Sequence, residues 1–89
     1  MKTTYHTFKN ILAKNFFIKP TKIAVKSQLN NDLGISSLEF IELIVTVENI
    51  FHIEINDKEL EHIKTVGELI TCINRNLATK YPNLYLNIA

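Results

Sequence analysis

The strongest constraint on the fold lies in residues 32–43, where a loop containing a glycine passes into a strongly apolar helix with two serines at the junction. Ser36 is a favourable helix N-cap, and Ser36-x-x-Glu39 has the form of a capping box. Ser37 then falls in the first turn, with its hydroxyl free to project outward. The unpaired N–H groups and the dipole at a helix start favour negative charge, so a phosphate esterified to Ser37 would be stabilised there. We therefore expect the function to reside at Ser37.

The helix that begins at this junction is predicted to run from about Ser37 to Phe51, and it carries two apolar stripes. One stripe makes a natural core face and consists of Phe40, Leu43, Val47 and Ile50. The second, which we call the outer stripe, consists of Leu38, Ile41 and Val45. It is flanked by Glu39, Glu42 and Glu48. Two interpretations remain open: the helix is buried almost all round, or the outer stripe and its glutamates form a surface that binds partner proteins.

The N-terminal part of the chain predicts one helix followed by a long loop. Apolar residues recur at three- and four-residue steps, which predicts a helix that starts after Thr3 or Thr4 and ends near Phe17. Pro20 disfavours helical geometry at the residue before it. Residues 18–36 then form a loop that must be pinned to the core, because long structureless loops are uncommon in compact domains. The expected anchors are Ile18, Ile23, Val25 and Leu29.

The C-terminal part predicts an extended connector and two more helices. A short third helix is expected over roughly residues 57–62, and Thr65 caps a fourth helix that stops before Pro82. Thr65-x-x-Glu68 is a second capping box. The fold class is therefore predicted to be all-α, a four-helix bundle with three longer helices and one short third helix. Residues 1–80 are expected to form the domain and residues 81–89 an apolar C-terminal tail.

Composition is consistent with one compact domain in the cytoplasm. The 89 residues are 46% hydrophobic and 21% charged, which suffices for a single small core. The apolar runs are too short to span a bilayer, and the N-terminus lacks the continuous apolar segment of a secretory signal. The single cysteine, Cys72, excludes an internal disulfide and is interpreted as a small buried apolar residue. We expect a monomer that does not bind membranes.

Charge is distributed unevenly along the chain. Residues 1–31 carry six lysines and no acidic residue, whereas residues 32–61 carry eight acidic residues and one lysine. The acidic segment would attract basic partner surfaces in a salt-dependent way. The lysines allow an alternative function, a small helical protein- or nucleic-acid-interaction domain without a prosthetic group. The acidic character of the longest helix disfavours nucleic acid, and we expect none to bind.

Other chemistry has little support in the sequence. The stretch after Gly34 lacks the second glycine of a Gly-x-Ser-x-Gly nucleophile elbow, and a hydrolase of that type needs a far larger sheet. His6, His52 and His62 show no metal-ligand spacing, and paired cysteines are absent. We predict no catalytic residue and no metal site, so the protein is not expected to be an enzyme.

Residues 32–38 resemble the Asp-Leu-Gly-x-Asp-Ser-Leu signature of acyl carrier proteins, with Ser36 in place of the second aspartate. The resemblance extends over about residues 5–77. It implies a freestanding carrier whose Ser37 receives a covalent 4′-phosphopantetheine arm from coenzyme A through a phosphopantetheinyl transferase. The implied further partners are acyl-loading enzymes and chain-elongating or acyl-transferring enzymes, which would bind Leu38, Glu39, Ile41, Glu42, Val45 and Glu48.

The same resemblance bears on the cargo. Aminoacyl carriers typically have Gly-Gly-His/Asp-Ser at the serine, whereas residues 33–37 are Leu-Gly-Ile-Ser-Ser, which favours an acyl or polyketide chain. Carriers of fatty acid synthesis are usually acidic throughout, and the lysine-rich residues 1–31 depart from that pattern. Fatty acid, polyketide or related specialised lipid synthesis therefore all remain as expected pathways.

Overall fold

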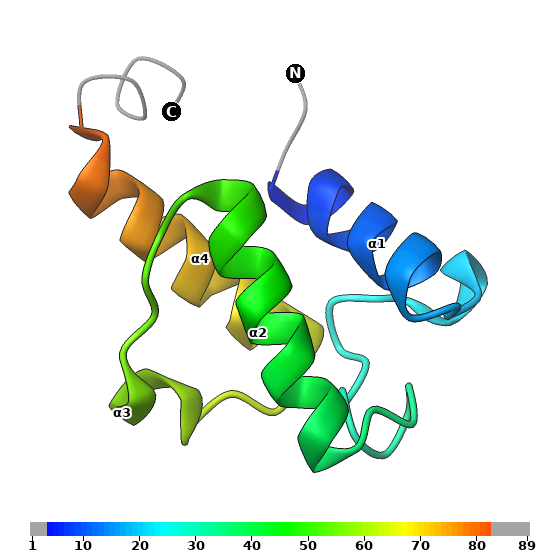
Figure 1. Cartoon of the computed structure of the whole chain (residues 1–89). Coiled ribbons are helices and arrows are strands. Elements are labelled where there is room, and N and C mark those ends of the chain that lie inside the picture. The colour runs from blue at the N-terminus through cyan, green and yellow to red at the C-terminus, as the bar shows by residue number, and fades with distance from the viewer. Residues whose placement is uncertain (1–3, 83–89) are drawn as a thin grey trace.

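A computed structural model describes residues 4–82, which form four α-helices and one short 3-10 helix. The elements in chain order are α1 (Thr4–Asn15), η1 (Pro20–Lys22), α2 (Ser37–Phe51), α3 (Asp57–Leu60) and α4 (Val66–Lys80). Figure 1 shows α1, α2 and α4 as the three long elements, with α3 set apart between two connectors. The described residues contain no β-strand. The predicted all-α fold class, with three longer helices and one short third helix, is confirmed.

Local sequence explains where the last three helices begin. Each starts with a capping box, in which a polar side chain accepts the N–H of the third helical residue and a glutamate side chain accepts the N–H of the cap. The three pairs are Ser36 with Glu39, Asn56 with Glu59, and Thr65 with Glu68. Because these contacts span only three residues, the helix starts can be read directly from the sequence.

One hydrophobic core joins α1, α2 and α4. Its most deeply buried side chains, at 0–1% exposure, are Phe8, Leu12, Leu43, Val47, Val66, Leu69, Cys72 and Ile73. Burial of such a side chain stabilises the fold by about 1.5–3 kcal/mol. The burial of Cys72 agrees with its interpretation as a small apolar residue.

The core face of α2 differs from the predicted stripe at one position. Leu43 and Val47 are buried as expected, and Phe40 is half-buried, but Ile50 is 46% exposed. Ile44 is buried instead, at 5% exposure. At 3.6 residues per turn the buried face is centred near Val47, and Ile50 lies at its edge in the last turn of the helix.

Two helix ends differ from the prediction. α1 stops at Asn15 rather than near Phe17, because Phe17 takes a left-handed backbone conformation with φ of 57°. The N–H groups of Phe16 and Ile18 both donate to the carbonyl of Leu12, which closes the helix end. α3 ends at Leu60, two residues before the expected His62, in a single turn.

The long loop between α1 and α2 is pinned to the core by side chains and by backbone. Three predicted anchors are buried, namely Ile18, Ile23 and Leu29. The fourth prediction was wrong, because the side chain of Val25 is 59% exposed. Its carbonyl is the anchor instead, since it accepts the N–H of Gly67 at 2.9 Å. Leu29 N–H likewise donates to the Lys64 carbonyl at 2.9 Å, so the loop is tied to the segment before α4.

Candidate functional site

Ser37 is the first residue of α2, and its side chain is exposed. The adjacent Ser36 is engaged in the capping box: its Oγ accepts the N–H of Glu39 at 3.2 Å, and its own N–H donates to Glu39 Oε1 at 2.9 Å. The Ser37 hydroxyl makes no hydrogen bond to any residue between 4 and 82. One serine therefore caps the helix, while the other is presented to solvent at the positive end of the helix dipole.

The loop before Ser37 is held in place by its own hydrogen bonds. Gly34 has a φ of 71°, which favours glycine, and its N–H donates to the Asn30 carbonyl at 2.9 Å. Asn30 Nδ2 donates to the Ile35 carbonyl at 3.0 Å, and the Ile35 side chain is buried at 4% exposure. Because the chain on both sides of the junction is fixed, the position of Ser37 is set by the fold.

A cavity of about 520 Å³ opens beside Ser37, between the long loop, the start of α2 and the segment before α4. We call it the Ser37 cavity. Its volume lies in the usual range for sites that bind small organic ligands. The apolar part of its lining consists of Leu29, Ile35, Phe40, Ile41 and Ile63. The polar residues of the lining are Gln28, Asn30, Asn31, Ser36, Ser37 and Lys64.

Lys64, in the connection between α3 and α4, is the one cationic residue among those that line this cavity. Within the described part of the chain its ammonium forms no ion pair, although it lies close enough to Glu68 to affect that carboxylate electrostatically. A cation and several amides beside Ser37 fit the phosphopantetheine arm, which carries a phosphate and amides. Sequence reasoning did not single out Lys64, because nothing local in the sequence relates it to Ser37.

The outer stripe of α2 lies at the surface. Leu38, Ile41 and Val45 are 67%, 60% and 49% exposed, so α2 is not buried all round. Glu39 and Glu42 are also exposed. These residues lie together along one side of α2, as an exposed apolar surface bordered by acidic residues should. Exposed apolar surfaces of this kind are typical of protein interaction sites.

Glu48, the sixth residue predicted to contact partners, has a structural role as well. Its side chain is half-buried, and Oε2 accepts the N–H of Ile55 at 2.8 Å. This bond fastens the connector after α2 to the side of the helix. Glu48 is therefore less available to a partner than Glu42, whose side chain makes no hydrogen bond within residues 4–82.

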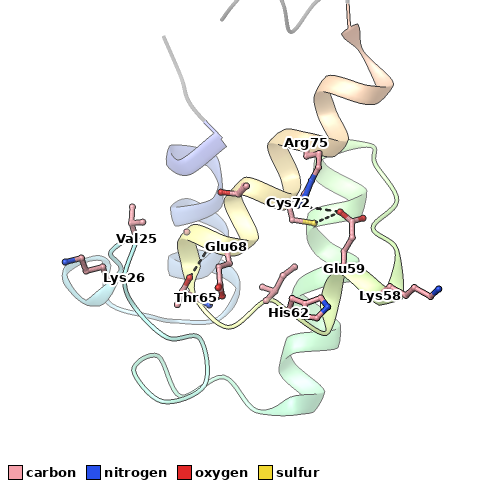
Figure 2. Close-up of a pocket in the computed structure, with 12 residues that line it drawn as sticks. Val25, Lys26, Lys58, Glu59, His62, Thr65, Glu68, Cys72 and Arg75 are labelled. Carbon is pink, nitrogen blue, oxygen red and sulfur yellow. Dashed lines mark hydrogen bonds and ion pairs between the residues drawn. The ribbon is translucent and has the colours of Figure 1, made fainter.

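A second hollow, of about 860 Å³, lies between α3, α4 and the long loop (Figure 2). At its base the thiol of Cys72 donates to Glu59 Oε2 at 3.4 Å, and Arg75 Nη2 lies 3.8 Å from the same oxygen. Burial, and after it the Glu59 carboxylate, raises the pKa of the Cys72 thiol to about 11. Because reactive cysteines act as thiolates, this thiol is not suited to nucleophilic chemistry.

Two further observations concern other kinds of site. Among residues 4–82, no group of three histidine, cysteine, aspartate or glutamate side chains is placed so that it could hold a metal ion. None of the helices in this part of the chain has the length and apolar character needed to cross a membrane.

Comparison with known proteins finds relatives over most of the chain. The family model described as the phosphopantetheine attachment site matches residues 6–73. Acyl carrier proteins of Coprothermobacter proteolyticus and Amoebophilus asiaticus are each 37% identical to the chain, over 85% and 80% of its length and 93% and 89% of theirs. An acyl carrier protein of Phaeodactylum tricornutum is 30% identical, over 85% of the chain and 100% of its own length.

Proposed function

The chain belongs to the acyl carrier protein family, whose members are carriers rather than enzymes and bear a phosphopantetheine arm, and we propose that its arm is attached at Ser37. The observation that best supports this proposal is that the side chains of Ser36 and Ser37 differ in their hydrogen bonding. Ser36 Oγ accepts a hydrogen bond from the N–H of Glu39, whereas the Ser37 hydroxyl is exposed and makes no hydrogen bond to the described residues.

The attachment reaction requires only that Ser37 be presented to a transferase. The Ser37 oxygen forms a bond to the phosphorus of coenzyme A that carries the pantetheine, the phosphoanhydride bond breaks, and 3′,5′-ADP leaves while the hydroxyl proton passes to the transferase. The product is a phosphodiester with one negative charge. The N-terminus of α2 favours that charge, and so does Lys64 across the Ser37 cavity.

When attached, the arm supplies a terminal thiol that holds an acyl group as a thioester. The residues of this chain bind and position the arm rather than catalyse its reactions. Lys64 would hold the phosphate end, and the amides of Asn30 and Asn31 would meet polar groups along the arm. Tethering raises the concentration of the cargo at each partner enzyme, which suffices for the carrier's role.

The pathway and partners follow from the same proposal. The cargo is an acyl chain of fatty acid, polyketide or related specialised lipid synthesis, carried by a cytoplasmic monomer. The partners are a phosphopantetheinyl transferase and acyl-loading, chain-elongating or acyl-transferring enzymes. They dock on the outer stripe, where the exposed side chains of Ile41 and Val45 lie beside Glu42. An interaction domain without a prosthetic group is disfavoured by membership of a family that is defined by its arm.

Intact-protein mass spectrometry tests the attachment. The chain is incubated with coenzyme A and a broad-specificity phosphopantetheinyl transferase, and fragmentation locates the added group. We expect one phosphopantetheine on the wild-type chain, none on Ser37→Ala, and one on the matched control Ser36→Ala. Loading of Ser37→Ala together with no loading of Ser36→Ala would assign the arm to Ser36. No loading of folded wild-type chain, under conditions that load a known carrier, would overturn the proposed function.

A further inference from the structure

Phe17 combines a left-handed backbone, which closes the end of α1, with an exposed aromatic side chain that the closure of the helix does not require. Its φ of 57° lies in the left-handed region, which only His52 shares among the other non-glycine residues that the structure describes. Residues with a Cβ atom disfavour that conformation. Its side chain is also 89% exposed, more than any other large apolar side chain between residues 4 and 82. Glycine or asparagine would adopt this backbone more readily and would expose no aromatic ring.

The ring of Phe17 borders a groove that also belongs to α2. We call it the Phe17 groove. One wall is formed by Asn15, Phe16 and Phe17, at the end of α1, and the other by Glu39, Ile41, Glu42, Val45 and Thr46 of α2. The groove has a volume of about 580 Å³, which can admit a large side chain. An aromatic ring from another segment of the chain thus extends the exposed apolar surface beyond α2.

The Phe17 groove is continuous with the surroundings of Ser37. Ile41 lines both the groove and the Ser37 cavity, and Glu39 lies two residues after Ser37. An enzyme that approaches the Ser37 hydroxyl along α2 would therefore lie beside the groove. The α2 wall of the groove carries Glu39 and Glu42, so it favours a partner surface with positive charge.

We propose that the Phe17 groove binds an apolar side chain, flanked by lysine or arginine, on the surface of the transferase that modifies Ser37. In this arrangement Phe17 is an anchor of the interface. Its ring is buried between the partner's apolar side chain and Ile41, while the cations of the partner pair with Glu42. Exposed aromatic anchors of this kind contribute much of the affinity of protein interfaces. The proposal rests on the proposed function and names a partner surface for it.

The test compares the steady-state kinetics of Ser37 modification for the wild-type chain and three variants, with a transferase that loads the wild-type chain. Phe17→Asn removes the ring but keeps a residue that tolerates the left-handed backbone. His52→Asn makes the same kind of change at the other left-handed residue, which lies at the far end of α2. Ile50→Gln removes an apolar side chain of α2 that is 46% exposed and lies outside the groove.

We expect Phe17→Asn to raise KM for the carrier roughly five- to thirtyfold, the range of one interface anchor, with kcat nearly unchanged. His52→Asn and Ile50→Gln should leave both constants nearly unchanged, and thermal unfolding should show Phe17→Asn to be at least as stable as the wild type.

Three outcomes would contradict the inference. If Phe17→Asn is modified at Ser37 with the KM of the wild type, the groove does not bind the transferase, and the proposed function stays intact. An equal rise in KM for Phe17→Asn and Ile50→Gln would show a general need for apolar surface rather than a groove. A wild-type dimer in sedimentation equilibrium that Phe17→Asn dissociates would assign the groove to a second copy of the chain. No modification of wild-type Ser37 at all would instead overturn the proposed function itself.

Discussion

Ser36 and Glu39 satisfy each other's backbone N–H groups: Ser36 Oγ accepts from Glu39 N at 3.2 Å, and Glu39 Oε1 accepts from Ser36 N at 2.9 Å. This reciprocal pair ends the loop and starts α2 at one defined residue. The neighbouring hydroxyl of Ser37 takes no part in the cap and makes no hydrogen bond to the described residues. If the arm is attached at Ser37, as proposed, stability and function depend on different serines and can be separated by mutation.

Ser36→Ala should lower the free energy of unfolding by about 1 kcal/mol, because a helix cap is lost. Ser37→Ala should change it little, since its hydroxyl makes no hydrogen bond to the described residues. Chemical denaturation of the unmodified proteins measures both effects. Equal denaturation midpoints for Ser36→Ala and the wild type would contradict the capping role of Ser36.

Glu42→Lys should slow the modification of Ser37, most strongly at low salt, where attraction between exposed charges is least screened. Glu54→Lys is the matched control, because it makes the same change in net charge at an exposed residue beyond the end of α2. Rates of modification are measured at several salt concentrations. If both variants slow the reaction equally, net charge rather than the acidic border of the outer stripe controls the encounter.

Lys64→Gln should reduce the stabilisation that the arm confers. Attachment at Ser37 would add a phosphodiester to the cavity that Lys64 lines, and an exposed ion pair contributes about 0.2–1 kcal/mol. Thermal unfolding of the unmodified and modified forms gives the gain for each variant. The gain should be smaller for Lys64→Gln than for the wild type or for Lys58→Gln, a lysine that does not line the Ser37 cavity. If modification raises the thermal stability of all three proteins equally, Lys64 does not interact with the arm.

Glu68 should make stability depend on pH in acid. Its carboxylate accepts the N–H groups of Lys64 and Thr65 at 2.7 and 3.0 Å, and these bonds hold the pKa of Glu68 below its usual value. A carboxyl whose pKa is lower in the folded state contributes stability above its unfolded pKa, and that stability is lost as the pH falls through the folded pKa.

Glu68→Gln tests this dependence, because glutamine keeps the shape of the side chain but does not titrate. Denaturation across the acid range should show the wild type more stable than Glu68→Gln near neutral pH, with the difference shrinking as the pH falls. Glu61→Gln serves as the control, since the Glu61 side chain is exposed and makes no hydrogen bond within residues 4–82. A difference that stays constant with pH would show that the Glu68 carboxylate is not the titrating group.

Cys72 should resist alkylation at neutral pH, because its thiol is buried and its pKa is raised to about 11. Treatment of the unmodified folded chain with iodoacetamide, followed by mass spectrometry, should show almost no addition until the chain is denatured. In the modified chain the thiol of the arm should react instead. Rapid labelling of Cys72 in the folded, unmodified protein would contradict the burial of its thiol.

The sequence alone predicted the features that depend on contacts within a few residues. The range Ser37–Phe51 for α2, the boxes that begin at Ser36 and Thr65, and the free hydroxyl of Ser37 could all be read locally. Capping involves side chains and N–H groups only three residues apart, so no knowledge of the rest of the fold is needed. The all-α class followed from apolar residues spaced at helical intervals.

Only the tertiary structure decided which edges of these elements are covered. The exposure of Ile50 and Val25 depends on how α2 and the long loop meet their neighbours, and periodicity does not contain that information. The same holds for Ser37 and Lys64, which line one cavity, and for Phe17 and Ile41, which line one groove, although the members of each pair are distant in the sequence. Local patterns determine where helices begin and which face is apolar, whereas the packing of one element against another determines what remains at the surface for a partner to bind.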